Sequence, residues 1–127
     1  MNYWILQEHI KRETPNAYLI ECPNKGEFMR MQYWVAKRQI RKYQTGNFIY
    51  YSVWLPPQAE IQMSRFRGKN RPRENAKISA ERLASLYYFI PTKIELRMEF
   101  EKQAMAADIA FEQGQRGGSA VRREFKI

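Results

Sequence analysis

Turn-forming residues recur at short intervals along the first half of the chain, and this spacing constrains the fold more than any other feature. The four groups are Thr14–Asn16, Pro23–Gly26, Thr45–Asn47 and Pro56–Gln58, and each combines residues that favour tight turns. The short segments between them are rich in aromatic and β-branched residues, which is typical of an antiparallel meander. We therefore expect strands at about 2–10, 16–22, 28–37, 47–55 and 59–67.

The segment 47–55 has the clearest strand pattern, because side chains alternate between the two faces of a strand. Ile49, Tyr51, Val53 and Leu55 share one face, which we predict to be the core face. The other face carries Phe48, Tyr50 and Trp54. These aromatic residues either lie under the helices or form an exposed platform for stacking bases.

Pro56 and Pro57 lie between the fourth and fifth expected strands. Proline cannot donate a ladder hydrogen bond, so it suits the end of a hairpin. We expect the two strands to pair about residue 57, with Val53 opposite Ile61 and Phe48 opposite Phe66.

The second half of the chain predicts a loop followed by helices. Residues 68–77 have no large apolar side chain and are expected to form an exposed basic loop. Ser79 has the sequence context of a helix N-cap, with Ile78 and Leu83 as a hydrophobic staple, and Pro91 is expected to end this first helix. Residues 92–113 favour a second helix by composition, whereas the alternation over 93–101 also allows a strand followed by a short helix.

The predicted fold class is α+β: a five-stranded antiparallel β-meander, or a small open barrel, followed by two C-terminal helices. One globular domain is expected over 1–114, with Gly114 as a plausible C-cap. It divides into a β-rich part (1–67), the basic loop (68–77) and a helical part (79–113), and 115–127 is expected to be a flexible basic tail. The sequence shows no internal repeat.

Positive charge is concentrated in one part of the sequence. Residues 30–77 hold eleven basic and two acidic residues, so their net charge of +9 equals that of the whole chain. Basic side chains interleaved with aromatic ones suit a polyanion whose bases can stack. The candidate nucleic-acid-binding residues are Lys37, Arg38, Arg41, Lys42, Arg65, Arg67, Lys69, Arg71, Arg73 and Lys77, and the candidate stacking residues are Phe48, Tyr50, Trp54 and Phe66.

The basic residues fall into two clusters, 37–42 and 65–73. In a meander the fifth strand returns to the end from which the fourth strand departs. We therefore expect both clusters to meet at one edge of the sheet and to form one continuous patch.

Catalytic and metal chemistry find little support in the sequence. The chain has one His, His9, and one Cys, Cys22, which cannot supply the usual ligand set of a zinc site. His9 is expected to be a partly exposed strand residue and Cys22 a small core residue. Asp108 is the single aspartate and no phosphate-binding glycine loop is present, so we expect a protein that is not an enzyme and needs no metal or cofactor.

The expected function is therefore non-enzymatic nucleic-acid binding through phosphate contacts and base stacking, with DNA and RNA equally open. The alternative is a small interaction or inhibitor protein of phage or mobile-element type. Such a protein would bind an acidic protein surface or a protein–RNA complex such as a host nuclease. The sequence has no apolar run long enough to span a membrane and no signal peptide pattern, and one cysteine allows no internal disulfide, so a cytoplasmic location is expected.

Overall fold

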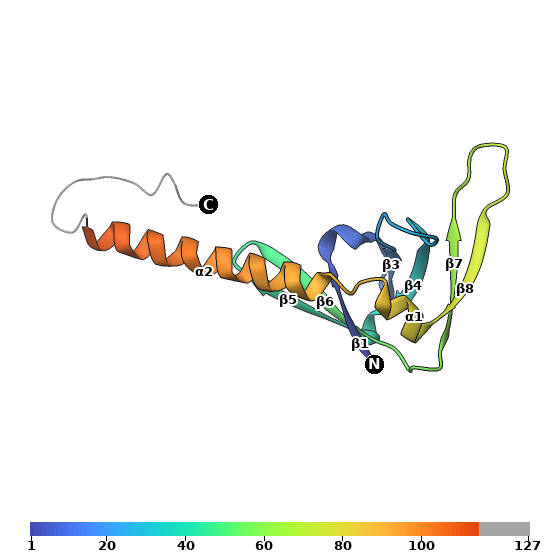
Figure 1. Cartoon of the computed structure of the whole chain (residues 1–127), viewed down its shortest axis with the longest axis horizontal. Helices are drawn as coiled ribbons and strands as arrows, with labels where there is room; N and C mark the ends of the chain where they lie inside the picture. The colour runs from blue at the N-terminus through green and yellow to red at the C-terminus, as the bar shows by residue number, and fades with distance from the viewer. Residues whose placement is uncertain (115–127) are drawn as a thin grey trace.

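The computed structural model describes the backbone of residues 1–114 and the side chains of residues 1–107. Within these residues it has an α+β fold with eight strands in two antiparallel sheets, so the expected fold class is confirmed (Figure 1). The predicted flexible tail lies outside the described residues. In chain order the elements are β1 (Asn2–Leu6), η1 (Gln7–His9), β2 (Ile10–Glu13), β3 (Ala17–Glu21), β4 (Gln32–Ala36), η2 (Lys37–Gln39), β5 (Ile40–Thr45), β6 (Phe48–Trp54), β7 (Glu60–Arg65), β8 (Glu74–Ser79), α1 (Ala80–Ser85) and α2 (Ile90–Gly114).

The first six strands form two copies of one structural unit. Each copy is a strand, a 3-10 turn and two further strands: β1-η1-β2-β3 and then β4-η2-β5-β6. In both copies a Tyr-Trp pair, Tyr3-Trp4 or Tyr33-Trp34, follows the first residue of the first strand, and the strand after the turn begins with an isoleucine. The expectation of no internal repeat is therefore wrong. The repeat was missed in the sequence because it lies in the order of elements and is supported by few identical residues.

The two units exchange their first strands. β1 pairs with β6 of the second unit, and β4 pairs with β3 of the first, both in antiparallel orientation. The registers correspond: Tyr3 lies opposite Val53, and Tyr33 lies opposite Ile20. The sheet β1-β6-β5 is thus the counterpart of β4-β3-β2, which is the first part of the larger sheet, as an approximate two-fold rotation requires.

Backbone hydrogen bonds beyond the strands follow the same correspondence. The Leu55 N–H donates to the carbonyl of Met1 at 3.0 Å, and the Cys22 N–H donates to the carbonyl of Met31 at 2.8 Å. Leu55 follows β6 as Cys22 follows β3, and Met1 precedes β1 as Met31 precedes β4. The exchanged strands are therefore held in equivalent ways at both junctions.

The core lies between the inner faces of the two sheets. Ile5 and Val53 come from the smaller sheet and Ile20 and Val35 from the larger one, and none is more than 3% exposed. Tyr51, Val53 and Leu55 are buried, which confirms the predicted core face of the segment 47–55.

The predicted hairpin between the fourth and fifth strands is wrong. β6 and β7 belong to different sheets, and Ile61 lies opposite Ile78 in β8, not opposite Val53. Pro56 and Pro57 carry the chain from one sheet to the other. β1, from the start of the chain, occupies the edge of β6 that the hairpin would have used.

Three strands, β2, β5 and β8, were not expected from the sequence, because the expected strand 2–10 stops after β1 and residues 7–9 form η1. β5 and β8 are edge strands. Charged residues are common on edge strands because one side faces solvent and charge discourages pairing with other chains. The charged residues in 37–42 and 68–77 therefore made β5 and β8 hard to predict. β8 replaces the end of the predicted loop.

The helices confirm the helical interpretation of 92–113. The Ser79 Oγ accepts the backbone N–H of Arg82 at 3.1 Å, so Ser79 is the N-cap of α1 as predicted. α2 begins at Ile90, and Pro91 therefore lies in its first turn, where a proline is tolerated, instead of ending the preceding helix. Ile90 is fully buried whereas Leu96 is 68% exposed, so the start of α2 is anchored in the core. The helix then runs along the β5–β6 hairpin and continues beyond its tip (Figure 1).

Candidate nucleic-acid interface

A groove of about 520 Å³ crosses the outer face of the five-stranded sheet, and Trp34 lies on its floor. The neighbours of Trp34 on β4, Tyr33 and Val35, point into the core, so strand alternation directs the indole outward. Trp34 is 48% exposed. The groove therefore presents a large aromatic face to solvent.

Cross-strand pairing places apolar and basic side chains beside Trp34. Leu19 on β3 lies opposite Trp34, and Arg12 on β2 lies opposite Leu19. Cross-strand neighbours on one face have Cβ atoms about 5 Å apart. Arg12 is exposed and forms no ion pair among the described residues, so its guanidinium is available to an anion.

Arg73 approaches the groove from the opposite side. Its Nε and Nη2 donate to the Ser64 Oγ at 3.2 and 2.9 Å. Ser64 lies opposite Gln32 on β4 and opposite Asn75 on β8, so these contacts fix the position of the guanidinium over the sheet. The Trp34 indole therefore lies between two basic side chains, because Arg12 is on β2, Trp34 is on β4 and Arg73 is beside β7.

Amide side chains complete the groove. Gln32, Gln62 and Asn75 all line it. Gln32 is oriented by a hydrogen bond from its Nε2 to the Glu21 Oε2 at 3.2 Å. Amides offer both donors and acceptors, which is what the edge of an unpaired base requires.

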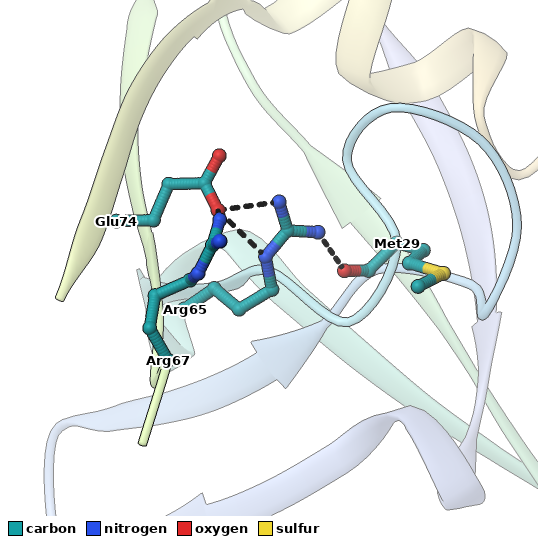
Figure 2. Close-up of polar contacts among 4 residues, drawn as sticks. All are labelled: Met29, Arg65, Arg67 and Glu74. Atoms are coloured by element: carbon teal, nitrogen blue, oxygen red, sulfur yellow. Dashed lines mark hydrogen bonds and ion pairs between the residues drawn. The ribbon is translucent and has the colours of Figure 1, made fainter. Parts of the chain in front are cut away.

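Two of the predicted binding residues, Arg65 and Arg67, are bound to one acid (Figure 2). The Arg65 Nη2 and Nε lie 2.6 and 3.1 Å from the Glu74 Oε1, and the Arg67 Nη1 lies 2.6 Å from the same oxygen. The Arg65 Nη1 also donates to the Met29 carbonyl at 2.7 Å. Arg65 therefore fastens the loop before β4 to the β7–β8 hairpin, and its charge is largely neutralised locally.

The two arginines also change the pKa of Glu74. Hydrogen bonds from Arg65 and then Arg67 lower the pKa of its carboxyl below the ordinary value of 4.5. The carboxylate is thus ionised at neutral pH and organises the base of the hairpin.

The two basic clusters lie at opposite ends of β4, so the predicted continuous patch is wrong. Gln32, at the start of β4, lies opposite Ser64, and β7 runs antiparallel to β4. The chain beyond Arg65 therefore extends away from the end of β4, where Lys37 follows. Five residues of strand span about 16 Å, and the hairpin tip projects further still (Figure 1).

The remaining predicted basic residues have different surroundings. Lys37 is bonded to the Glu13 carboxylate and lies 5.0 Å from the centre of the Tyr18 ring. Lys77 pairs with Glu60 at 3.8 Å. The other five, namely Arg38, Arg41, Lys42, Lys69 and Arg71, have no ion pair among the described residues.

The predicted stacking residues separate into covered and exposed ones. Tyr50 is 9% exposed and its hydroxyl lies 3.7 Å from the Met98 Sδ of α2. The Arg97 guanidinium lies 5.7 Å from the centre of the Phe48 ring. Trp54, at the other end of this face of β6, is 49% exposed, so α2 covers one end of the face and leaves the other open. Phe66, which lies between β7 and β8, is 67% exposed.

Arg12 and Trp34 were missed by sequence reasoning. Strand alternation alone could have placed Trp34 on the face opposite to Tyr33 and Val35, which are buried in the structure. No sequence signal indicated Arg12, because its position depends on pairing between β2 and β3, which carries a register shift between Ile10 and Arg12.

His9 and Cys22 have structural environments. His9 is buried in η1, contrary to the expected exposed strand position, and its Nδ1 accepts the Leu6 N–H at 3.0 Å. Burial lowers the pKa of His9, so the ring is held neutral. Cys22 is a buried core residue as expected, and burial raises the pKa of its thiol to about 12, which disfavours the nucleophilic thiolate.

The described residues contain no cluster of three or more His, Cys, Asp or Glu side chains suited to hold a metal ion. Within this same part of the chain, no helix combines the length and apolar character needed to cross a membrane. Comparisons with protein-family models, with curated proteins and with solved structures gave no match.

Proposed function

We propose that this protein binds single-stranded nucleic acid without catalysing a reaction, through the groove around Trp34. The observation that carries the proposal is the arrangement of a half-exposed indole between Arg12 and Arg73 in a groove of about 520 Å³. An unpaired base can stack on an indole, and every base has a face that can do so. A duplex would shield its bases from such a contact.

Each part of the groove supplies one interaction. Trp34 stacks on a base, while Arg12 and Arg73 neutralise the phosphates on either side of it. Gln62 and Asn75 reach the base edge with their amides. Since the two arginines are on opposite sides of the indole, the backbone of the bound strand crosses β4 instead of running along it.

Binding of short oligothymidine and oligouridine, followed by fluorescence anisotropy, tests the proposal. Trp34→Ala should weaken binding roughly 5- to 150-fold, which corresponds to the roughly 1–3 kcal/mol of one stacked base. Arg12→Gln should weaken binding and reduce the slope of log K against log salt by about 0.7, as expected for one lost phosphate contact on a single strand.

Matched controls come from exposed residues outside the groove. Tyr88 is 68% exposed, and Tyr88→Ala should leave affinity unchanged. Lys93, on α2, serves as the charge control through Lys93→Gln. Equal losses for Trp34→Ala and Tyr88→Ala, or duplex binding as tight as single-strand binding, would reject the groove as the site.

A second candidate function is binding to another protein, including an acidic protein or a protein–RNA complex. It is supported by the exposed apolar side chains of α2, where Leu96 is 68% and Met105 60% exposed. Large exposed apolar groups on one element are characteristic of protein contact surfaces. Purified protein that binds no oligonucleotide at low salt would favour this candidate over the first.

A further inference from the structure

We propose that the three-stranded sheet carries a second single-strand binding site, equivalent by the internal repeat to the groove around Trp34. This inference rests on the proposed function. It assigns the same ligand chemistry, an unpaired base with its phosphates, to a separate surface of the domain.

The second site is a groove of about 400 Å³ on the outer face of β1-β6-β5. It contains two basic side chains, two exposed aromatic rings and two small polar side chains, and is lined by Arg38, Arg41, Tyr43, Trp54, Asn2 and Ser52. Trp54 is 49% and Tyr43 37% exposed. The composition therefore matches that of the first groove: basic, aromatic and amide groups together.

The strand registers show that equivalent positions of the repeat line both grooves. Ile10 lies opposite Ile20, and Ile40 lies opposite Val53, which fixes the correspondence of the two units. One position earlier along β3 and β6, Leu19 lies opposite Arg12, and Ser52 lies opposite Arg41. Arg12 and Arg41 are therefore equivalent, once the register shift after Ile10 is taken into account.

The amide positions correspond as well. Gln32 begins β4 and Asn2 begins β1, and the two strands are equivalent. Gln32 lies opposite Glu21, and Asn2 lies opposite Trp54. An arginine and an amide thus occupy the same repeat positions in both grooves.

The aromatic residue is supplied differently in the second groove. Trp4 is the counterpart of Trp34, but its ring packs 5.6 Å from Tyr43 and 5.7 Å from Tyr50, measured between ring centroids. Trp54 is the residue left open, and it stands where the first unit has Glu21. The stacking surface is therefore shifted by one strand, from β1 to β6.

The two grooves lie on opposite sides of the domain. Both sheets direct their inner faces to the common core, so their outer faces point away from each other. One short oligonucleotide cannot occupy both grooves at once. The protein is thereby built to bind two segments of nucleic acid, either from two strands or from one strand that passes around it.

Binding stoichiometry measured by calorimetry and native mass spectrometry tests this. With an oligonucleotide of about four nucleotides, the short end of single-strand site sizes, the full chain should bind two molecules. At an oligonucleotide concentration that just saturates the unmodified protein, Trp54→Ala and Trp34→Ala should each reduce the number of bound molecules to about one, and the double variant should bind almost none. Because both indoles are half exposed, the variants should retain the circular dichroism spectrum of the unmodified protein.

The outcomes separate the two proposals. One bound oligonucleotide that is lost in Trp34→Ala and kept in Trp54→Ala would overturn the second site and leave the proposed function intact. Absence of any binding to the unmodified protein would overturn both. Tyr88→Ala, which removes an exposed aromatic outside either groove, should retain two bound molecules.

Discussion

The hydroxyl oxygens of Tyr3 and Tyr33 lie 3.0 Å apart in the core, although the two residues are 30 positions apart in the sequence. They hold equivalent positions in the two units, so the two units contact each other here through equivalent residues. The Tyr87 hydroxyl lies 2.8 Å from that of Tyr33 and donates to the Glu21 carbonyl at 3.0 Å. A hydroxyl has one hydrogen to donate, so Tyr33 donates to Tyr87 and Tyr3 donates to Tyr33.

Removing the central hydroxyl with Tyr33→Phe should lower the free energy of unfolding by about 1–3 kcal/mol, because the Tyr3 donor would be left buried without an acceptor. Urea unfolding followed by circular dichroism measures the loss. Tyr43→Phe is the matched control, since Tyr43 is 37% exposed. Similar stability for both variants would mean that the hydroxyl chain does not stabilise the fold.

Val53 is fully buried, and Val53→Ala should cost about 1–3 kcal/mol of stability, as large-to-small changes in a core do. Ser52→Ala, one residue earlier on the outer face, should change stability little. Denaturant unfolding that ranks the two variants in the opposite order would contradict the observed facing of β6.

Arg65→Ala should lower the melting temperature, because it removes the hydrogen bonds to both the Glu74 carboxylate and the Met29 carbonyl. Arg71→Ala, in the hairpin loop, should leave the melting temperature nearly unchanged. Arg65 is therefore expected to hold the fold, whereas Lys69 and Arg71, which have no ion pair among the described residues, are expected to be free to bind. Equal thermal stability of the two variants would argue against this division.

The Glu74 carboxyl should make stability depend on acidity. The pKa of Glu74 is lowered in the folded protein. The stability that its carboxylate contributes is therefore fully present at pH values above its ordinary pKa of 4.5, and is lost as the pH falls through the lower pKa of the folded state. Wild type should thus be more stable than Glu74→Gln at neutral pH, and the difference should shrink in that acidic range. A difference that stays constant with pH would exclude ionised Glu74 as its source.

The two basic clusters should act independently. Arg38→Ala with Arg41→Ala, and Lys69→Ala with Arg71→Ala, alter opposite ends of β4. Losses in binding free energy from well-separated sites add within about 0.5 kcal/mol. On a single strand long enough to pass around the protein, the combined variant should therefore show the sum of the two losses in anisotropy titrations, and a clear departure from additivity would indicate that the two clusters are energetically coupled.

Local features were predictable from this sequence, and long-range pairing was not. The facing of 48–54, the Ser79 cap and the helical state of 92–113 depend on neighbours in the sequence, and the structure confirms all three. The meander was predicted from the assumption that consecutive strands pair. Here β1 pairs with β6 and β4 pairs with β7, and neither pair is consecutive in the sequence, which places the candidate residues differently.

The candidate site shows the same division. Basic and aromatic character was evident from composition, and Trp54 and Arg73 were among the predicted residues. The prediction did not anticipate that Glu74 would take up Arg65 and Arg67, because the pairing of β7 with β8 brings these residues together. The distance between the basic clusters 37–42 and 65–73 depends on the strand order, which the sequence did not reveal.

The exchanged strands also set the order of events during synthesis. Asn2 has its partner at Trp54, and Tyr3 has its partner at Val53. A growing chain therefore presents β1 with an open edge until the whole of β6 has left the ribosome, and such edges favour association with other chains. The first unit alone gives β1 no partner, so the sheet β1-β6-β5 can be completed only after the second unit has been made.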